Sequence, residues 1–182
     1  VMPNVREPFV KPIPIVSLRP TQMTVGMREV REKRKRWREH KSDKKRAELL
    51  GKHMVPVVLG PDEHHYVVDH HHLARALHDE GVKDILVTVI GDLSMVDRDA
   101  FWGVMDNKRW VYPYDAKGER QRFRDLPKSI ADLKDDPFRS LAGELRLAVL
   151  GIDVIRVPED RDASDARHRL LQELEPLGGE LR

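Results

Sequence analysis

The chain has 182 residues, of which 40% are hydrophobic and 35% charged, and its net charge is only +2. That length suits one domain with an appendage. The absence of cysteine excludes a disulfide framework and thiolate catalysis, and it fits a reducing cytoplasm. No apolar run approaches the roughly 20 residues of a membrane span, and Val1–Val10 lacks a signal-peptide pattern, so we expect a cytoplasmic protein with no membrane partner.

The first half of the chain alternates extended and helical patterns. Four prolines before residue 15 predict an extended arm over 1–12, and an apolar run predicts a short strand over 13–18. In residues 27–50, Val30 and Trp37 share one helical face, so we expect one long helix ending at Gly51. Two β-type runs, 55–59 and 65–68, flank turn residues and predict a hairpin.

A second helix is expected over 70–80, directly after the hairpin, with Asp69 as its N-cap. Residues 84–90 are a continuous apolar run, which is typical of a buried strand. Ser94 is expected to cap a helix that runs to about Lys108. The remaining expected elements are short helices at 127–134 and 137–147, a strand at 152–157 and a last helix at 164–174.

This order of elements predicts an α+β fold, with a small mixed sheet, flanking helices and a mainly helical C-terminal extension. We divide the chain into an extended arm at 1–12, a core at 13–95 and a helical extension at 96–182 that packs on the core.

Three consecutive histidines, His70, His71 and His72, occupy the first turn of the helix expected at 70–80. Unpaired backbone N–H groups and the helix dipole attract anions there, typically phosphate. Histidine also suits acid–base work because it titrates near neutrality. The functional interpretation is a phosphate or nucleotide site with Arg75 nearby. The structural alternative is that Asp69 only caps the helix while the histidines lie on the surface or pack on the sheet.

A metal site is a further possibility, because seven histidines fall between residues 53 and 78. Their spacing matches no zinc signature, and on a helix His70, His71 and His72 point about 100° apart. We therefore prefer Mg²⁺ carried in by a nucleotide, with Asp69 as its protein carboxylate, over a metal held by the protein alone.

Residues 28–46 contain eleven Lys or Arg and four acids. Such a segment can lie along a nucleic-acid backbone, for which Arg31, Lys35 and Arg38 are the candidate contacts. The alternative is a solvated helix face, since Glu29–Lys33 and Glu32–Arg36 have the spacing of stabilising i, i+4 pairs.

Several motifs, in this order, resemble the ParB/sulfiredoxin superfamily, and within it the bacterial ParB-like nuclease group. The likeness covers about residues 13 to 146. The superfamily likeness rests on 18–22 (LRPTQ), 55–58 (VPVV) and 68–77 (VDHHHLARAL). The likeness to the ParB-like nuclease group is strongest at 24–30 (TVGMREV), 69–77 (DHHHLARAL) and 112–115 (YPYD).

The resemblance implies a small α/β fold whose sheet-to-helix turn binds nucleotide phosphates. ParB proteins bind and hydrolyse CTP and act on DNA, sulfiredoxin uses ATP, and free-serine kinases phosphorylate an amino acid. The two histidines of the kinase turn match His71 and His72, and Arg75 matches an arginine of the ParB turn. Gln22 lies nearest the position of a kinase glutamate, and His70 stands where the kinases keep glycine.

Our first hypothesis is therefore a nucleotide-binding enzyme that cleaves a phosphoester or phosphoanhydride, as a nuclease or nucleotide hydrolase does. Its cofactor is ATP, ADP or CTP with Mg²⁺. The phosphate-binding residues are expected to be His70, His71, His72, Arg75 and Arg19, and the catalytic residues His71, His72, Asp69 and Gln22. The alternatives are a non-catalytic DNA- or partner-binding module that uses residues 28–46, and a free-amino-acid kinase.

Overall fold

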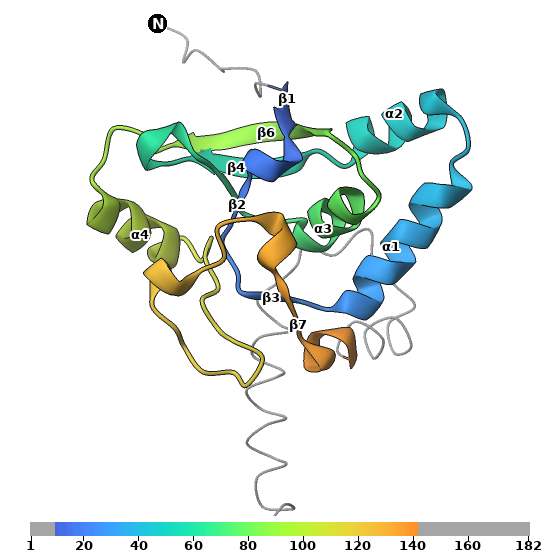
Figure 1. Ribbon diagram of the computed structural model, residues 1–182. Coiled ribbons are helices and arrows are strands. Elements are labelled where there is room, and N and C mark those ends of the chain that lie inside the picture. The colour runs from blue at the N-terminus through green and yellow to red at the C-terminus, as the bar shows by residue number, and fades with distance from the viewer. Residues whose placement is uncertain (1–9, 142–182) are drawn as a thin grey trace, which may run out of the picture.

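The computed structural model describes residues 10–141 and is built on a mixed five-stranded sheet (Figure 1). The strand order is β1-β6-β4-β5-β2, and the strands are β1 (Val10–Pro14), β2 (Arg19–Pro20), β4 (Val55–Leu59), β5 (His65–Val67) and β6 (Asp84–Asp92). The β1–β6 and β4–β5 pairs are antiparallel, whereas β4–β6 and β2–β5 are parallel. A second sheet joins β3 (Thr24–Val25) in parallel to β7 (Lys134–Asp135).

Four α-helices that lie wholly within residues 10–141 flank the sheets. They are α1 (Met27–Glu39), α2 (Asp43–Lys52), α3 (His71–Asp79) and α4 (Arg98–Asn107). In Figure 1, α1 and α3 lie side by side on one side of β2, and α4 lies on the other. The α+β fold with a mixed sheet is thus confirmed. No helix within residues 10–141 has the length and apolar character needed to cross a bilayer.

The prediction of one long helix over 27–50 is wrong, because the structure has two helices there. The chain leaves the helical path at His40, and Ser42 then caps α2 by accepting a hydrogen bond from the Lys45 N–H at 3.3 Å. A serine that caps a new helix competes with continuation of the old one. Gly51 does not end α2, which runs to Lys52.

Other boundaries also differ from the prediction. The strand expected at 13–18 begins at Val10, and η1 (Ile15–Ser17) follows it. Asp97 rather than Ser94 caps α4, since its side chain accepts from two backbone N–H groups. The helix expected at 127–134 is only a short turn, η4 (Ile130–Asp132), followed by β7.

The described part of the extension, residues 96–141, is less helical than expected. It contains α4, the turns η3 (Phe123–Asp125) and η4, the strand β7, and a helical stretch that starts at residue 137. The predicted strand at 152–157 and helix at 164–174 lie outside the described residues. The three-part division of the chain stays a prediction.

Two hydrophobic clusters form the core. The first lies between the sheet and helices α1 and α3 and includes Val57 and Leu77, whereas the second lies under α4 and includes Val58 and Phe101. Adjacent residues of β4 serve opposite clusters because successive strand side chains point to opposite faces. The sheet is therefore covered on both faces.

Glu80 joins α1 to α3. Arg34 and Arg38 donate hydrogen bonds to its carboxylate at 2.7 to 2.8 Å. The hydrogen bonds from Arg38 and then Arg34 outweigh burial and lower the pKa of Glu80 from 4.5 to about 2. Because the folded-state pKa lies below the unfolded one, these ion pairs stabilise the fold above pH 4.5, and the stabilisation is lost as the pH falls toward 2.

Replacing Glu80 by Gln is therefore expected to lower the free energy of unfolding at pH 7. The gap between wild type and variant should close as the pH falls from 4.5 to about 2. Urea titrations across this range measure the gap. A gap that does not change with pH would show that Glu80 contributes nothing through its charge. Glu48→Gln, at an exposed position on α2, is the matched control.

Candidate functional site

The candidate site is built around the chain segment 21–26, which links β2 to α1. Because β2 runs parallel to β5, the end of β2 and the start of α3 meet at one edge of the sheet. The segment therefore passes directly over the first turn of α3. His71 and His72 on that turn are 2% and 5% exposed, so both rings are buried beneath it.

His71 holds the beginning of the segment. Its Nε2 lies 3.2 Å from the backbone nitrogen of Thr21, which donates its N–H. The Thr21 hydroxyl lies 3.4 Å from the same Nε2 and donates to the Val67 carbonyl at 2.6 Å. A ring nitrogen that accepts a backbone N–H carries no proton, so this contact defines a neutral imidazole.

His72 holds the end of the segment in the same way. The Gly26 N–H donates to its Nε2 at 2.9 Å, and Glu29 Oε2 lies 3.6 Å from the same atom. Gly26 also allows a close approach on its other side, because a Cβ there would lie 3.0 Å from the Ser140 backbone nitrogen. The two histidines thus act as a pair of acceptors that fasten segment 21–26 to α3.

This geometry bears on the roles predicted for His71 and His72. A phosphate contact or a proton transfer through Nε2 requires the ring to give up its backbone N–H partner. Phosphate binding and acid–base catalysis by these rings stay predictions, and the contacts seen in the structure support the alternative in which the histidines pack within the fold.

His70 begins α3, and it is the N-cap in place of Asp69. Its backbone is left-handed, with φ of 65°, and the Asp69 carboxylate accepts its N–H at 2.7 Å. A left-handed backbone is unfavourable for a residue with a Cβ, so this turn stores strain of about 1 kcal/mol.

The two predicted arginines are directed elsewhere. Arg75 donates to the carbonyls of Ala131 and Leu133 and pairs with Asp79 at 3.0 Å, so it fastens η4 to α3. Arg19 hydrogen-bonds the Lys128 carbonyl and lies 3.0 Å from His64 Nε2. The structure does not bring either guanidinium to the histidine turn.

Gln22 lies within segment 21–26 and faces a second group of residues. Its Oε1 accepts from Arg139 at 3.0 Å, and the Arg139 guanidinium lies 4.7 Å from the Tyr112 ring centre. The buried Gln22 Nε2 has no hydrogen-bond partner among residues 10–141. An amide cannot accept a proton as a carboxylate does, so a free-amino-acid kinase would have no base at this position.

Asp136 and Arg139 were missed as site residues. Asp136 is fully buried, accepts from the Thr24 hydroxyl at 3.2 Å and caps the helical stretch at 137 through the N–H groups of Phe138 and Arg139. The signal was present, because an aspartate directly before a proline is typical of a helix start. Nothing local in the sequence indicated its contact with Thr24.

His53, which follows α2, is affected by the charges of three other groups. Burial lowers the pKa of His53, and the charges of His70, Lys33 and Lys52 lower it further. These groups come from α1, α2 and the α3 turn. Among residues 10–141, no three His, Asp or Glu side chains are placed to hold a metal ion together.

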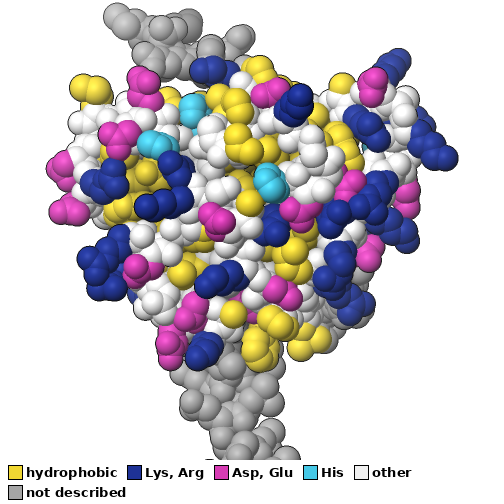
Figure 2. Space-filling view, in the orientation of Figure 1, with side chains coloured by type: hydrophobic (Ala, Val, Ile, Leu, Met, Phe, Trp, Pro, Cys, Tyr) yellow, Lys and Arg dark blue, Asp and Glu magenta, His cyan; other side chains and the backbone are white. Residues whose placement is uncertain are grey.

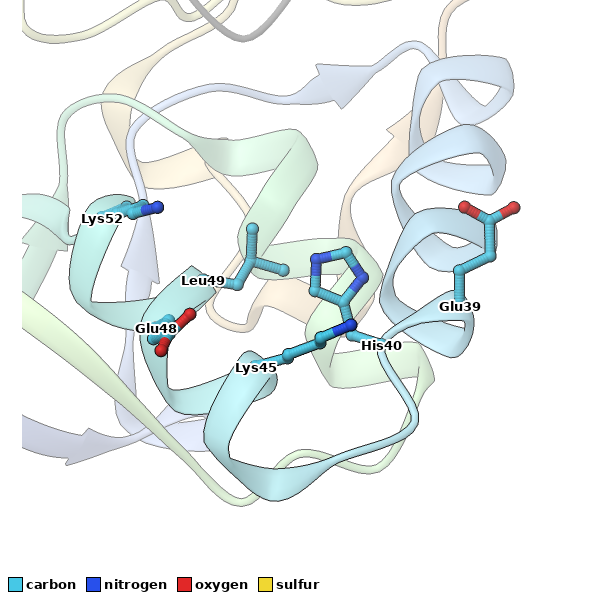
Figure 3. Close-up of a pocket in the computed structure, with 6 residues that line it drawn as sticks. All are labelled: Glu39, His40, Lys45, Glu48, Leu49 and Lys52. Carbon is cyan, nitrogen blue, oxygen red and sulfur yellow. The ribbon is translucent and has the colours of Figure 1, made fainter.

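A groove of about 410 Å³ lies between the end of α1 and α2 (Figure 3). It is lined by Glu39, His40, Lys45, Glu48, Leu49 and Lys52. None of the predicted site residues lines it.

The mixed sheet, the hairpin and the strand-to-helix turn at residues 69–72 define a small α+β protein of the ParB-like class. The chain belongs to the family described as "Putative ParB-like nuclease", whose model matches residues 11–153. It is also similar to the crystal structure of protein Atu1540 from Agrobacterium tumefaciens. The two share 46% sequence identity with a TM-score of 0.77, over 93% of this chain and 84% of that chain. No curated protein matches the chain. The predicted family and fold class are thereby confirmed.

Proposed function

We propose that this ParB-like protein binds the phosphates of a nucleotide at the turn between β5 and α3. The observation that carries the proposal is the left-handed backbone of His70, directly followed by the right-handed residues of α3. Successive residues of opposite hand make a concave nest of backbone N–H groups that suits an oxyanion, and a phosphate would take the place that the Asp69 carboxylate now has at the His70 N–H. The positive end of the helix dipole adds to the attraction.

The charges around the turn support the proposal. His70, Lys33 and Lys52 each act on His53 and lower its pKa, so these three groups surround one residue near the turn. Lys33 also pairs with Glu29 at 3.1 Å, which reduces its contribution to the positive potential. The remaining positive potential favours a ligand with several negative charges, as a nucleoside di- or triphosphate has. ATP, ADP and CTP are the candidates.

We further propose that the bound nucleotide undergoes phosphoester or phosphoanhydride cleavage. The protein offers a metal ion few ligands at this turn. Residues 10–141 contain no group of three His, Asp or Glu placed to hold a metal, and Asp69 is a carboxylate at the turn itself. Mg²⁺ would be held mainly by the phosphates, and when bound it neutralises their charge. His71 and His72 serve this chemistry by fixing segment 21–26 against the turn.

A pair of His70 variants tests whether the backbone or the side chain binds the phosphates. His70→Gly keeps the left-handed turn without strain, so we expect equal or higher stability and an unchanged rise in melting temperature with nucleotide and Mg²⁺. His70→Val disfavours that backbone. We expect this variant to lose about 1–2 kcal/mol of unfolding free energy and to show no rise in melting temperature with nucleotide. Thermal-shift panels with ATP, ADP, CTP and GTP measure both.

Two results would contradict these expectations. If His70→Gly remains folded but loses the nucleotide response, the imidazole is the ligand and the backbone nest is not. If no nucleotide raises the melting temperature of the wild-type protein, the proposed function is wrong.

A second candidate function is DNA binding through α1 and α2, and one observation favours it. Arg31 and Lys35 lie four residues apart, are exposed, and form no ion pair with any described residue. Arg38, by contrast, is bound to Glu80. Figure 2 shows Lys and Arg side chains gathered over α1 and α2. Such free cations suit phosphate groups of a nucleic-acid backbone.

Fluorescence anisotropy with a DNA duplex tests this candidate. The double variant Arg31→Gln/Lys35→Gln should bind less tightly and reduce the slope of log affinity against log salt by about two. Arg38→Gln is the control, and it should change the slope less. An affinity that does not depend on salt would rule out binding through this face.

A further inference from the structure

Arg19 has an unusual environment for an arginine. Its guanidinium is half-buried at the edge of the sheet, where it donates to the Lys128 carbonyl and faces His64 Nε2 at 3.0 Å. Both partners are neutral acceptors. No carboxylate of residues 10–141 forms an ion pair with Arg19. Because both of these partners are neutral, the charge of Arg19 is available to an anion from outside.

His64 is fixed as a neutral neighbour. Its Nδ1 lies 3.3 Å from the Pro61 carbonyl, which can only accept, so Nδ1 carries the proton. Its Nε2 lone pair then faces the Arg19 guanidinium. The imidazole holds Arg19 in place and leaves its positive charge uncompensated.

The hairpin turn before His64 also contacts a second arginine, Arg98. Asp62 and Glu63 both have left-handed backbones, with φ of 60° and 56°. This strained turn directs Asp62 toward Arg98 of α4, and the two side chains form an exposed ion pair at 2.9 Å.

Tyr66 lies beside the same hairpin, with its ring centre 6.3 Å from that of His64. Burial raises the pKa of its hydroxyl, and the charges of Arg98 and then Arg19 lower it, so both guanidinium groups act on one phenol. The Tyr66 ring packs on Phe101 at 4.6 Å and on Trp102 at 5.5 Å. In Figure 2, a histidine and several Lys or Arg side chains surround a hydrophobic patch on this side of the molecule, over the β4–β5 hairpin and α4.

We propose that Arg19, Arg98 and His64 form a second binding site, which takes a phosphate-type oxyanion. Guanidinium groups bind the paired oxygens of a phosphate in a forked geometry. On binding, the anion takes Asp62's place on Arg98 and supplies Arg19 with the counter-ion it lacks. This site is separate from the α3 turn and does not rest on the function proposed there. It keeps the phosphate role predicted for Arg19 but with different neighbours.

Calorimetric titration with inorganic phosphate tests the proposal. Arg98 is well exposed, so Arg98→Gln should leave the fold intact and weaken phosphate binding by about tenfold. Arg19→Gln should weaken it at least as much. Asp62→Asn should tighten binding, because it removes the competing carboxylate while asparagine still tolerates the left-handed backbone. Arg122→Gln, which alters another exposed arginine paired with an aspartate, is the control and should change nothing.

Two further measurements identify the source of the anion and separate this site from the one at α3. Tighter binding of AMP than of inorganic phosphate identifies a nucleotide as the source, whereas equal binding identifies free phosphate. His70→Val should leave this binding unchanged, which separates it from the site at α3. Absence of phosphate binding, or wild-type affinity in both arginine variants, would overturn the proposal.

Discussion

Replacing His72 by alanine is expected to destabilise the protein by about 3 kcal/mol. The change removes a buried ring and leaves the Gly26 N–H, which now donates to Nε2 at 2.9 Å, without its acceptor. Of the two histidine acceptors on α3, His71 alone would still receive a backbone N–H from segment 21–26. Chemical denaturation followed by circular dichroism measures the loss.

Two controls separate this structural role from a catalytic one. His72→Gln places an amide oxygen near the position of Nε2, so it should recover part of the stability. His78→Ala removes a half-buried histidine of the same helix and should cost far less. If His72→Ala were as stable as the wild type, the Gly26 contact would not hold the segment.

Replacing Asp136 by alanine is the second change with a large expected effect, also about 3 kcal/mol. It takes away the acceptor of the Thr24 hydroxyl and of the Phe138 and Arg139 N–H groups, and it removes a carboxylate 3.8 Å from the Arg139 guanidinium. Removing one member of a buried charge pair leaves the other uncompensated. Denaturation measures the loss, and hydrogen exchange shows whether it is concentrated in segment 21–26 and residues 134–140.

Asp136→Asn is the matched control. Asparagine keeps the oxygen that caps residues 138 and 139 but loses the charge that faces Arg139, so we expect an intermediate loss. Equal losses in the two variants would mean that the charge, and not the cap, carries the whole effect.

Local patterns in the sequence were sufficient for much of the fold. Turn residues between two alternating apolar runs predicted the β4–β5 hairpin, and helical spacing after it predicted α3. The break at His40 was missed because the charged pattern continues through it with helical spacing. Ser42 can either continue the first helix or cap a second one, and the local composition does not show which of the two occurs.

The candidate site was less accessible to prediction, for a physical reason. The sequence shows where His71, His72 and Arg75 lie on one helix, but their partners are backbone groups about 50 residues away. A backbone N–H or carbonyl is present at nearly every residue and leaves no sequence signal. Residue types that suit phosphate contacts also suit the fastening of a loop, and only the fold distinguishes these uses.

We expect His71 and His72 to be neutral acceptors that hold segment 21–26 against the start of α3. Imidazole ¹⁵N NMR at pH 7 tests it most directly, with and without nucleotide and Mg²⁺. Both rings should be protonated at Nδ1 and bare at Nε2, and they should remain so when nucleotide is added. A proton on Nε2 of either ring, or imidazolium formed on nucleotide binding, would contradict it.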